Sequence, residues 1–338
     1  MSVYELIDKK VIDYAEIVVN LFDHCNMRCA FCPQDHGSTV GASRDEIMSK
    51  VQPIVDWINN NQRSTYFKIH IMGGELFQDG WVDKGFLNIY QEFINEITYR
   101  VMLTKKVTFN FVTNLVFTKQ YLINEFLLKN NLKISISYDL KGRFTDPQKE
   151  QFKDNVEIFQ DMIEMVSLVA TKQNIQALLY REDPYFDYLY SKFTMDWDSY
   201  LPSVKIAEKM MPKESELLAF YKRLVDEYPK CLNVQHFLNG KYENKMTCTR
   251  GNSYTILFDN SNPAGCSGSV LLRDGNTKDL GSTKIIENFF KKYNCFECEY
   301  YKQCPFTCFI RADYSKMEQD IDGCVFKHTF DHVKNRVR

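Results

Sequence analysis

The sequence predicts an α/β fold in which parallel strands alternate with crossover helices, followed by a smaller cysteine-rich region. In the first two-thirds of the chain, short apolar runs alternate with longer amphipathic segments, the pattern typical of a parallel sheet. From about residue 231 glycine, asparagine and cysteine dominate, and long periodic segments disappear. A region with so little apolar core needs something other than hydrophobic burial to hold it together. We therefore expect two domains, residues 1–230 and 231–338.

The strands are expected where apolar or alternating runs are bounded by polar residues. These runs are residues 15–22, 67–72, 107–113, 132–138, 165–170 and 201–207. Helical patterns lie between them at 44–60, 81–99, 120–130 and 155–162, and a helix at 215–228 is expected to close the first domain. In the second region we expect a β-hairpin with strands at 254–258 and 269–272, together with short helices.

Composition excludes several classes of partner. The 338 residues include 42 basic and 44 acidic side chains, so a net charge of −2 leaves no electrostatic footprint for nucleic acid. The N-terminus lacks the apolar segment of a signal peptide, and no run approaches the roughly 18 apolar residues of a membrane span. We therefore expect a cytoplasmic protein with no nucleic-acid and no membrane partner. In such a protein, 11 cysteines in clustered spacings favour metal binding over disulfides.

Cys25, Cys29 and Cys32 stand in the run HCNMRCAFCP, with a C-x3-C-x2-C spacing. Three thiolates can hold three irons of a [4Fe–4S] cluster, which four cysteines normally ligate. One iron is then open to an exogenous ligand, as in a catalytic metal site. The run follows the expected strand 15–22, and a (β/α) barrel places its chemistry at the carboxyl ends of its strands. Half of a zinc site and buried small hydrophobes are the alternatives.

Gly73-Gly74-Glu75 follows the expected strand 67–72. Two glycines let the backbone approach a ligand closely, and a carboxylate can receive an ammonium group. A tight turn that ends in an acid would look the same. Its place after the cysteine triad, at the end of the next strand, favours a binding site.

The triad and the Gly73–Glu75 turn together resemble the signature of the radical S-adenosylmethionine (SAM) superfamily. The resemblance implies a partial (β/α)6, TIM-like barrel whose open side admits substrate. It also implies that the open iron chelates SAM, and that an electron, supplied by a flavodoxin or ferredoxin, cleaves SAM to a 5′-deoxyadenosyl radical. This radical would abstract hydrogen from a substrate C–H bond, which makes the protein an oxidoreductase. The implied SAM contacts are Phe31, Gly73, Gly74, Glu75, Asn114 and Ser137, and Asp139 would face either SAM or substrate.

The later cysteines resemble the seven-cysteine pattern of the SPASM domain, which carries two auxiliary [4Fe–4S] clusters. The resemblance assigns Cys295, Cys298, Cys304 and Cys324 to an outer cluster, and Cys248, Cys266 and Cys308 to an inner one. A pair of zinc knuckles is the alternative, because soft thiolates suit both metals.

Cys231 is the remaining cysteine. Residues 240–247 hold no cysteine that would complete the inner cluster. Three interpretations of Cys231 therefore stay open: a distant fourth ligand, a catalytic hydrogen-atom donor, or an inert buried thiol.

The resemblance favours modification of a peptide side chain, by crosslinking or oxidation, in the maturation of a ribosomal peptide. Because the triad begins at residue 25, we expect no leader-recognition domain before it. A separate leader-recognition protein, or a short leader bound at the barrel mouth, would then be required. Sulfatase maturation is one alternative, although Ser267 stands where those enzymes carry an aspartate. A small-molecule substrate such as an aminocyclitol or amino acid is another, and a zinc or electron-transfer module without SAM chemistry is a third. The aromatic stretch 180–190 suits either a substrate cleft or the core.

Overall fold

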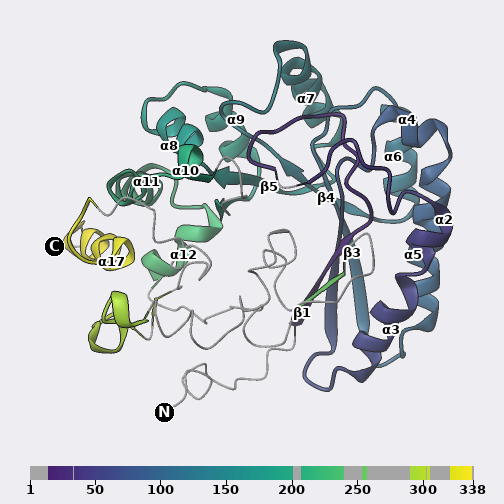
Figure 1. Ribbon diagram of the computed structural model, residues 1–338, viewed down its shortest axis with the longest axis horizontal. Helices are drawn as coiled ribbons and strands as arrows, with labels where there is room; N and C mark the ends of the chain where they lie inside the picture. The colour runs from purple at the N-terminus through teal and green to yellow at the C-terminus, as the bar shows by residue number, and fades with distance from the viewer. Residues whose placement is uncertain are drawn as a thin grey trace.

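A curled sheet of parallel strands forms the centre of the computed structural model, which describes residues 14–32, 34–200, 207–239, 253–256, 290–301, 303–304 and 320–336. The strand order is β6-β5-β4-β3-β2-β1-β7, and every neighbouring pair is parallel. Helices lie along the outer side of the curl (Figure 1). The α/β partial barrel predicted from the sequence is confirmed.

Five of the expected strands lie where the apolar runs placed them. The strands are β1 (Tyr14–Asn20), β2 (Tyr66–Met72), β3 (Lys106–Thr113), β4 (Lys133–Ser137), β5 (Ile163–Ala170), β6 (Met195–Ser199) and β7 (Ser253–Ile256). Along β2 buried residues alternate with half-buried ones. Its apolar residues therefore pack against the helices while the others face the inside of the curl.

The sixth strand of the sheet is β6, which lies before the expected run 201–207. In β6 the buried residues Met195 and Trp197 alternate with two aspartates. It is an edge strand of the sheet, so it needs no continuous apolar run. Residues 201–206 lie outside the described part of the chain, and Ala207 begins helix α10.

Two of the expected helices are each divided in two. The helices on the outer side are α2 (Arg44–Met48), α3 (Val51–Asn60), α4 (Asp79–Asp83), α5 (Phe86–Arg100), α6 (Gln120–Lys129), α7 (Asp146–Phe159), α8 (Lys172–Leu179) and α9 (Tyr185–Lys192). Gly85, with φ +81°, separates α4 from α5, because a left-handed residue ends a helix. Helix α7 begins well before the expected residue 155, since Thr145 and Gln148 form a capping box at its start.

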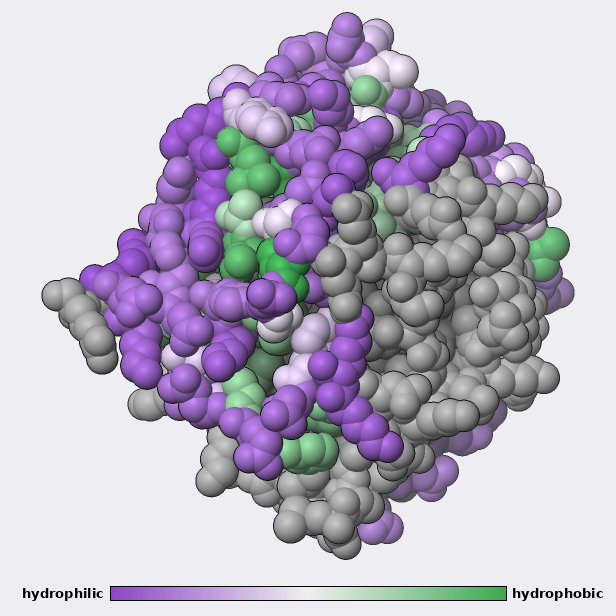
Figure 2. Space-filling view, turned by 60° about the vertical axis from the view of Figure 1, so that its left-hand side comes forward, coloured by the Kyte–Doolittle hydropathy of each residue, from purple (hydrophilic) through white to green (hydrophobic). Residues whose placement is uncertain are grey.

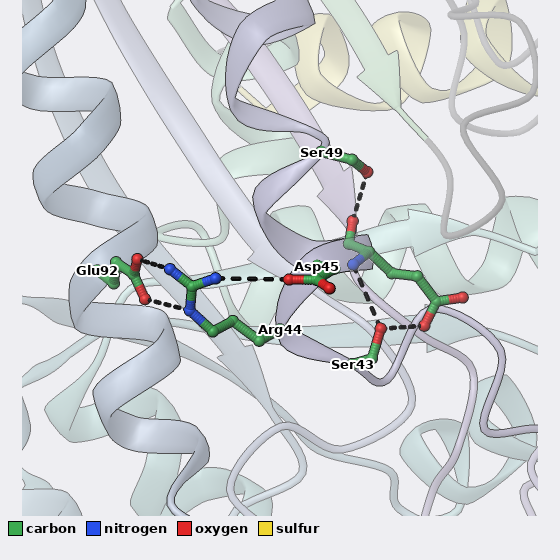
Figure 3. Close-up of polar contacts among 6 residues, drawn as sticks. Ser43, Arg44, Asp45, Ser49 and Glu92 are labelled. Carbon is green, nitrogen blue, oxygen red and sulfur yellow. Dashed lines mark hydrogen bonds and ion pairs between the residues drawn. The ribbon is translucent and has the colours of Figure 1, made fainter.

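Helix α2, which follows the cysteine-triad loop, is tied to α5. Ser43 caps α2 by accepting a hydrogen bond from the backbone N–H of Glu46, and its hydroxyl donates to the Glu46 carboxylate at 2.6 Å. Arg44 forms a two-pronged ion pair with Glu92 on α5 (Figure 3). These contacts fix the end of the loop that carries Cys25, Cys29 and Cys32.

The core between the sheet and helices α5 and α6 is rich in aromatic rings. Phe111, fully buried on β3, lies 5.2 Å from Phe77, 5.7 Å from Tyr90 and 5.8 Å from Phe126 between ring centroids. Such pairs are stabilised beyond their buried area.

The aromatic stretch 180–190 lies largely in helix α9. Phe186 is buried, with its ring 5.0 Å from that of Tyr228 and 5.8 Å from that of Trp197, whereas Tyr180 is exposed. The stretch therefore packs as part of the core, and this agrees with the second of the two interpretations, core and not substrate cleft.

The C-terminal helices pack beside the sixth strand. Helix α11 (Glu214–Glu227) contacts α12 (Leu232–Asn239) and α17 (Val325–Arg336), and His332 Nε2 donates a hydrogen bond to the Asp226 carboxylate at 2.9 Å. Figure 2 shows that hydrophilic side chains predominate on this side of the molecule, with hydrophobic ones in a narrow band. The described helices include none long and apolar enough to cross a membrane.

The expected strand at 254–258 is present as β7, but it pairs in parallel with β1 at the edge of the main sheet. Its expected hairpin partner, residues 269–272, lies outside the described residues. The domain boundary at residue 230 stays a prediction.

We expect Phe111→Ala to lower the free energy of unfolding by about 3–5 kcal/mol, because it leaves a cavity among three rings. Tyr121→Ala is the control, since Tyr121 is 78% exposed and should change stability by less than about 0.5 kcal/mol. Urea unfolding followed by circular dichroism measures both. Equal effects would show that the aromatic cluster does not stabilise the fold.

Candidate functional site

The predicted site residues gather at the carboxyl ends of β1 to β4. The cysteine triad follows β1, the Gly73–Glu75 turn follows β2, Asn114 follows β3, and Ser137 ends β4. Because these four strands are parallel and adjacent, their carboxyl ends form one edge of the barrel, where this fold holds its active site.

Gly73 and Gly74 lie against the backbone at the root of the triad loop. A Cβ on Gly74 would stand 2.1 Å from the carbonyl oxygen of His24, and one on Gly73 would stand 2.7 Å from that of Phe22. The contact is hydrogen-bonded, since the N–H groups of Gly74 and Glu75 donate to Phe22 and His24 at 2.8 and 3.0 Å. Only glycine therefore fits here, and the approach that requires it is that of the triad loop.

Glu75 joins the ends of β2 and β3. Its fully buried carboxylate accepts hydrogen bonds from the N–H of Phe77 at 2.9 Å, the hydroxyl of Thr113 at 2.8 Å and the N–H of Asn114 at 2.6 Å. Burial raises the pKa of Glu75 to about 7, although these three bonds lower it. A carboxylate has about four acceptor sites. One of these sites has no partner among the described residues, and the contact of Glu75 with SAM stays a prediction.

Asn114 links the end of β3 to the triad. Its side-chain amide lies 3.8 Å from the Cys25 sulfur and donates to Asn26 at 2.8 Å. Asn26 in turn donates to the carbonyl of Val116 at 2.7 Å. Cys25 itself is held by a bond from its N–H to the carbonyl of His36 at 3.1 Å.

Of the triad, Cys25 is buried and Cys29 and Cys32 are half-buried, and the three lie close enough to affect one another. Burial raises the pKa of Cys25 to about 12, and the negative charges of Glu75 and of the other two cysteines add to the increase. Burial likewise raises the pKa of Cys32 to about 11 and that of Cys29 above its ordinary value. Thiols with pKa values raised in this way are protonated at neutral pH, and cysteines bind metal as thiolates, so metal binding here would release their protons. A cluster of irons, for which soft thiolates are suitable ligands, fits this donor set.

Arg143 is a cation at this site that sequence reasoning missed. Its guanidinium lies 5.2 Å from the centre of the Phe31 ring and donates to the carbonyl of Ser137 at 3.2 Å. Its charge lowers the pKa of Cys29 and of Asp139, which places it between the triad and the end of β4. The sign of it in the sequence was a basic residue directly after a glycine, Gly142, in the short loop that follows β4. In the structure Gly142 has φ +98°.

Asp139 is buried beside Arg143 with one oxygen occupied. The amide of Asn174, at the start of α8, donates to Oδ1, and Oδ2 has no hydrogen-bond partner among the described residues. Asn174 also donates to the carbonyl of Val169 at 2.9 Å and accepts from the N–H of Lys141 at 3.1 Å. Burial raises the pKa of Asp139 to about 6, against the influence of Arg143 and Asn174. A buried acceptor without a partner is energetically costly and is suited to a ligand.

Apolar side chains form a wall beside the triad. Tyr200, Met210 and Met211 are buried together, and Phe31 and Val169 pack against them. The aromatic face of Phe31 therefore lies between a cation and an apolar cluster.

The structure also brings together three of the predicted outer-cluster cysteines. Cys295 and Cys298 lie on one turn of 3-10 helix (Cys295–Glu297), and Cys324 immediately precedes α17. Burial raises the pKa of Cys295 to about 12, and Cys324 and Cys298 raise it further. Cys304 is half-buried against the main core. Cys248, Cys266 and Cys308 of this cysteine-rich region, and also Ser267, lie outside the described residues.

Cys231 lies away from both groups of cysteines. It is fully buried in the main core just before α12, and Asp196 adds to the burial that raises its pKa to about 12. Asp196 is the second residue of β6. Cys231 therefore lies near the amino end of that strand, and its three interpretations stay open.

Solved structures with bound SAM share this architecture. One is anSMEcpe, an anaerobic sulfatase-maturating enzyme, with a TM-score of 0.66 at 17% identity over 96% of this chain and 98% of that one. Its complex with SAM and the Kp18Cys peptide gives the same TM-score and coverage at 15% identity. Streptococcus suis SuiB bound to SAM gives 0.55 at 15% identity over 96% of this chain and 80% of its own.

The chain has the fold of a radical SAM enzyme. No protein-family model and no curated protein matches the sequence. At these identities the likeness is one of fold, and the chemistry has to be argued from the residues of the site.

We expect Gly74→Ala to displace the root of the triad loop, because its Cβ would overlap the His24 carbonyl. The variant should unfold more easily by about 1–3 kcal/mol and lose up to about a third of the iron after anaerobic reconstitution, which is the share of one of three expected clusters. Gly80→Ala is the matched control, since nothing lies within 4 Å of its Cβ position. Normal iron content in Gly74→Ala would show that the turn does not position the cysteines.

Proposed function

We propose that this protein is a radical SAM enzyme, an oxidoreductase that abstracts a hydrogen atom from a peptide side chain. The observation that carries the proposal is the convergence of three buried or half-buried thiols, the Arg143 guanidinium and a carboxylate oxygen of Asp139 without a partner among the described residues, at the carboxyl edge of the barrel. The alternative of half a zinc site gives no role to the cation and the aromatic ring beside the thiols.

Cys25, Cys29 and Cys32 would hold a [4Fe–4S] cluster with one open iron, and SAM would bind there. Such a cluster, once reduced, supplies the electron that cleaves SAM to a 5′-deoxyadenosyl radical. The electron donor would be a flavodoxin or ferredoxin. The chain's own task is to orient SAM and exclude water.

Each polar group of the site has a role in holding SAM or substrate. The Arg143 guanidinium suits the carboxylate of SAM, because charge-assisted bonds of this kind are strong and directional. Phe31 and its apolar neighbours suit the adenine, and the Gly73–Glu75 turn, Asn114 and Ser137 would line the remaining side. Asp139 Oδ2 would accept a hydrogen bond from SAM or from the substrate.

Modification of a peptide, by crosslinking or oxidation, is the substrate class that we favour. A structure with this fold binds SAM together with the Kp18Cys peptide, and SuiB is a radical SAM peptide modifier. Two auxiliary [4Fe–4S] clusters, one held by Cys295, Cys298, Cys304 and Cys324 and the other by Cys248, Cys266 and Cys308, would accept the electron that a net oxidation releases. Leader recognition would fall to a separate protein, and the protein would act in the cytoplasm.

Two other substrate classes lead to different products. Sulfatase maturation would convert a serine or cysteine to formylglycine, and the fold of anSMEcpe favours it, whereas Ser267 in place of an aspartate opposes it. A small-molecule substrate such as an aminocyclitol or amino acid would leave every peptide unmodified.

Cys29→Ala tests the cluster assignment. We expect the reconstituted wild-type protein with SAM and dithionite to form 5′-deoxyadenosine, and Cys29→Ala to reduce the product to background, because two thiolates cannot retain the cluster. Cys231→Ala is the control and should keep both its iron content and its product. Liquid chromatography with mass spectrometry measures 5′-deoxyadenosine, and addition of the Kp18Cys peptide reports peptide oxidation as a mass change.

Wild-type protein that forms no 5′-deoxyadenosine would contradict the proposed function and favour a zinc or electron-transfer module. Loss of iron in Cys231→Ala would instead identify Cys231 as a cluster ligand.

Arg143→Gln tests the SAM-binding role of the cation. Because a hydrogen bond to a charged group contributes about 1.5–3 kcal/mol, the dissociation constant of SAM should rise roughly 10- to 150-fold. Lys141→Gln is the control, since Lys141 lies in the same loop but pairs with Glu182 at the surface. Equilibrium dialysis with labelled SAM measures both variants, and equal affinities would exclude Arg143 from the SAM site.

A further inference from the structure

The two segments that supply the described C-terminal cysteines attach to adjacent residues at the start of α11. The hydroxyl of Tyr293, two residues before Cys295, donates to Glu214 Oε1 at 2.7 Å. On the other segment, Asp320, four residues before Cys324, accepts from the N–H of Ser215 at 2.9 Å and from its hydroxyl. The first turn of α11 therefore contacts both of the segments that supply cysteines to this site.

Glu214 is also a buried acid, and Tyr293 binds only one of its two carboxylate oxygens among the described residues. The residue is 2% exposed, and its Oε2 has no hydrogen-bond partner within the described ranges. Burial of a carboxylate without full compensation is costly. If Glu214 did no more than bind Tyr293, one neutral acceptor would be enough, and the amide oxygen of a glutamine would provide it.

The charge of Glu214 reaches the cysteine site. Burial raises the pKa of Cys324, and the negative charges of Cys298 and Glu214 raise it further. The N–H groups of Phe326 and Lys327, at the start of α17, oppose this increase. Glu214 thus lies within electrostatic range of the sulfur of Cys324.

We propose that Glu214 is a positioning and tuning residue of the outer auxiliary cluster: its Tyr293 bond helps to set the cysteine geometry, and its charge lowers the reduction potential of the cluster. The inference rests on the proposed function, in which Cys295, Cys298, Cys304 and Cys324 hold that cluster. Net charge and hydrogen bonds around a cluster set its potential. A nearby anion disfavours the added electron, so the cluster would pass electrons on more readily than it would without Glu214.

Glu214→Gln is the decisive variant, because glutamine keeps an acceptor for Tyr293 and removes the charge. The host is the full chain with Cys25, Cys29 and Cys32 replaced by alanine, so that only auxiliary clusters give a signal. Electron paramagnetic resonance during a redox titration measures their midpoint potentials. We expect one midpoint to become more positive in Glu214→Gln at unchanged iron content.

Glu227→Gln is the matched control. It removes the same charge from the other end of α11, 13 residues and about 20 Å away, which is beyond the Debye length of about 8 Å at physiological salt. Its midpoints should equal those of the host. Ser215→Ala, which weakens the tie to Asp320 without a change of charge, should lower the iron content and leave the midpoints of the remaining clusters unchanged.

Midpoints in Glu214→Gln that equal those of the host, at full iron content, would overturn the inference and leave the proposed function intact. If Glu214→Gln binds no iron, Glu214→Asp decides: recovery of iron supports a role for the charge, and failure to recover it contradicts that role. A host protein without any auxiliary-cluster signal would contradict the proposed cluster content itself.

Discussion

The buried carboxylate of Glu75 is the contact on which the rest of the site depends. It ties the ends of β2 and β3 through hydrogen bonds from Phe77, Thr113 and Asn114, and Asn114 then reaches Cys25. On the other side of the same turn, two glycines admit the backbone of Phe22 to His24. One turn therefore fixes the end of β2, the end of β3 and the root of the triad loop, so that the thiols are positioned by the sheet itself.

The features that the sequence predicted correctly are those with a local cause. Apolar periodicity located β1 to β5, and the position of each motif after its apolar run placed the triad, the Gly73–Glu75 turn and Asn114 at neighbouring strand ends. Even there, the reason for Gly73 and Gly74 was incomplete, because the surface that their backbone approaches belongs to a loop 50 residues earlier. A turn with two glycines indicates that another group comes close to the backbone, and only the fold shows which group it is.

The features that the sequence did not predict depend on long-range pairs or on burial. Arg143 lies in a loop with no periodicity, and only the fold brings it over Phe31. Met195–Ser199 has too few apolar residues to be distinguished from a loop, yet β5 pairs with it along its whole length. In the sequence, Glu214 is an ordinary acidic residue at the start of a helix. Its partner Tyr293 lies 79 residues later, and no local pattern connects the two.

The pairing of β7 with β1 has a consequence for how the chain can be divided. Residues 253–256 come from the cysteine-rich part of the sequence, but their backbone pairs with Glu16–Val19 in the first strand of the barrel. Cutting the chain at residue 230 would leave that side of β1 with unpaired N–H and C=O groups, an open edge of the kind that recruits other chains and aggregates. The barrel is therefore completed by the sequence that follows it, and the two parts are best produced and folded as a single unit.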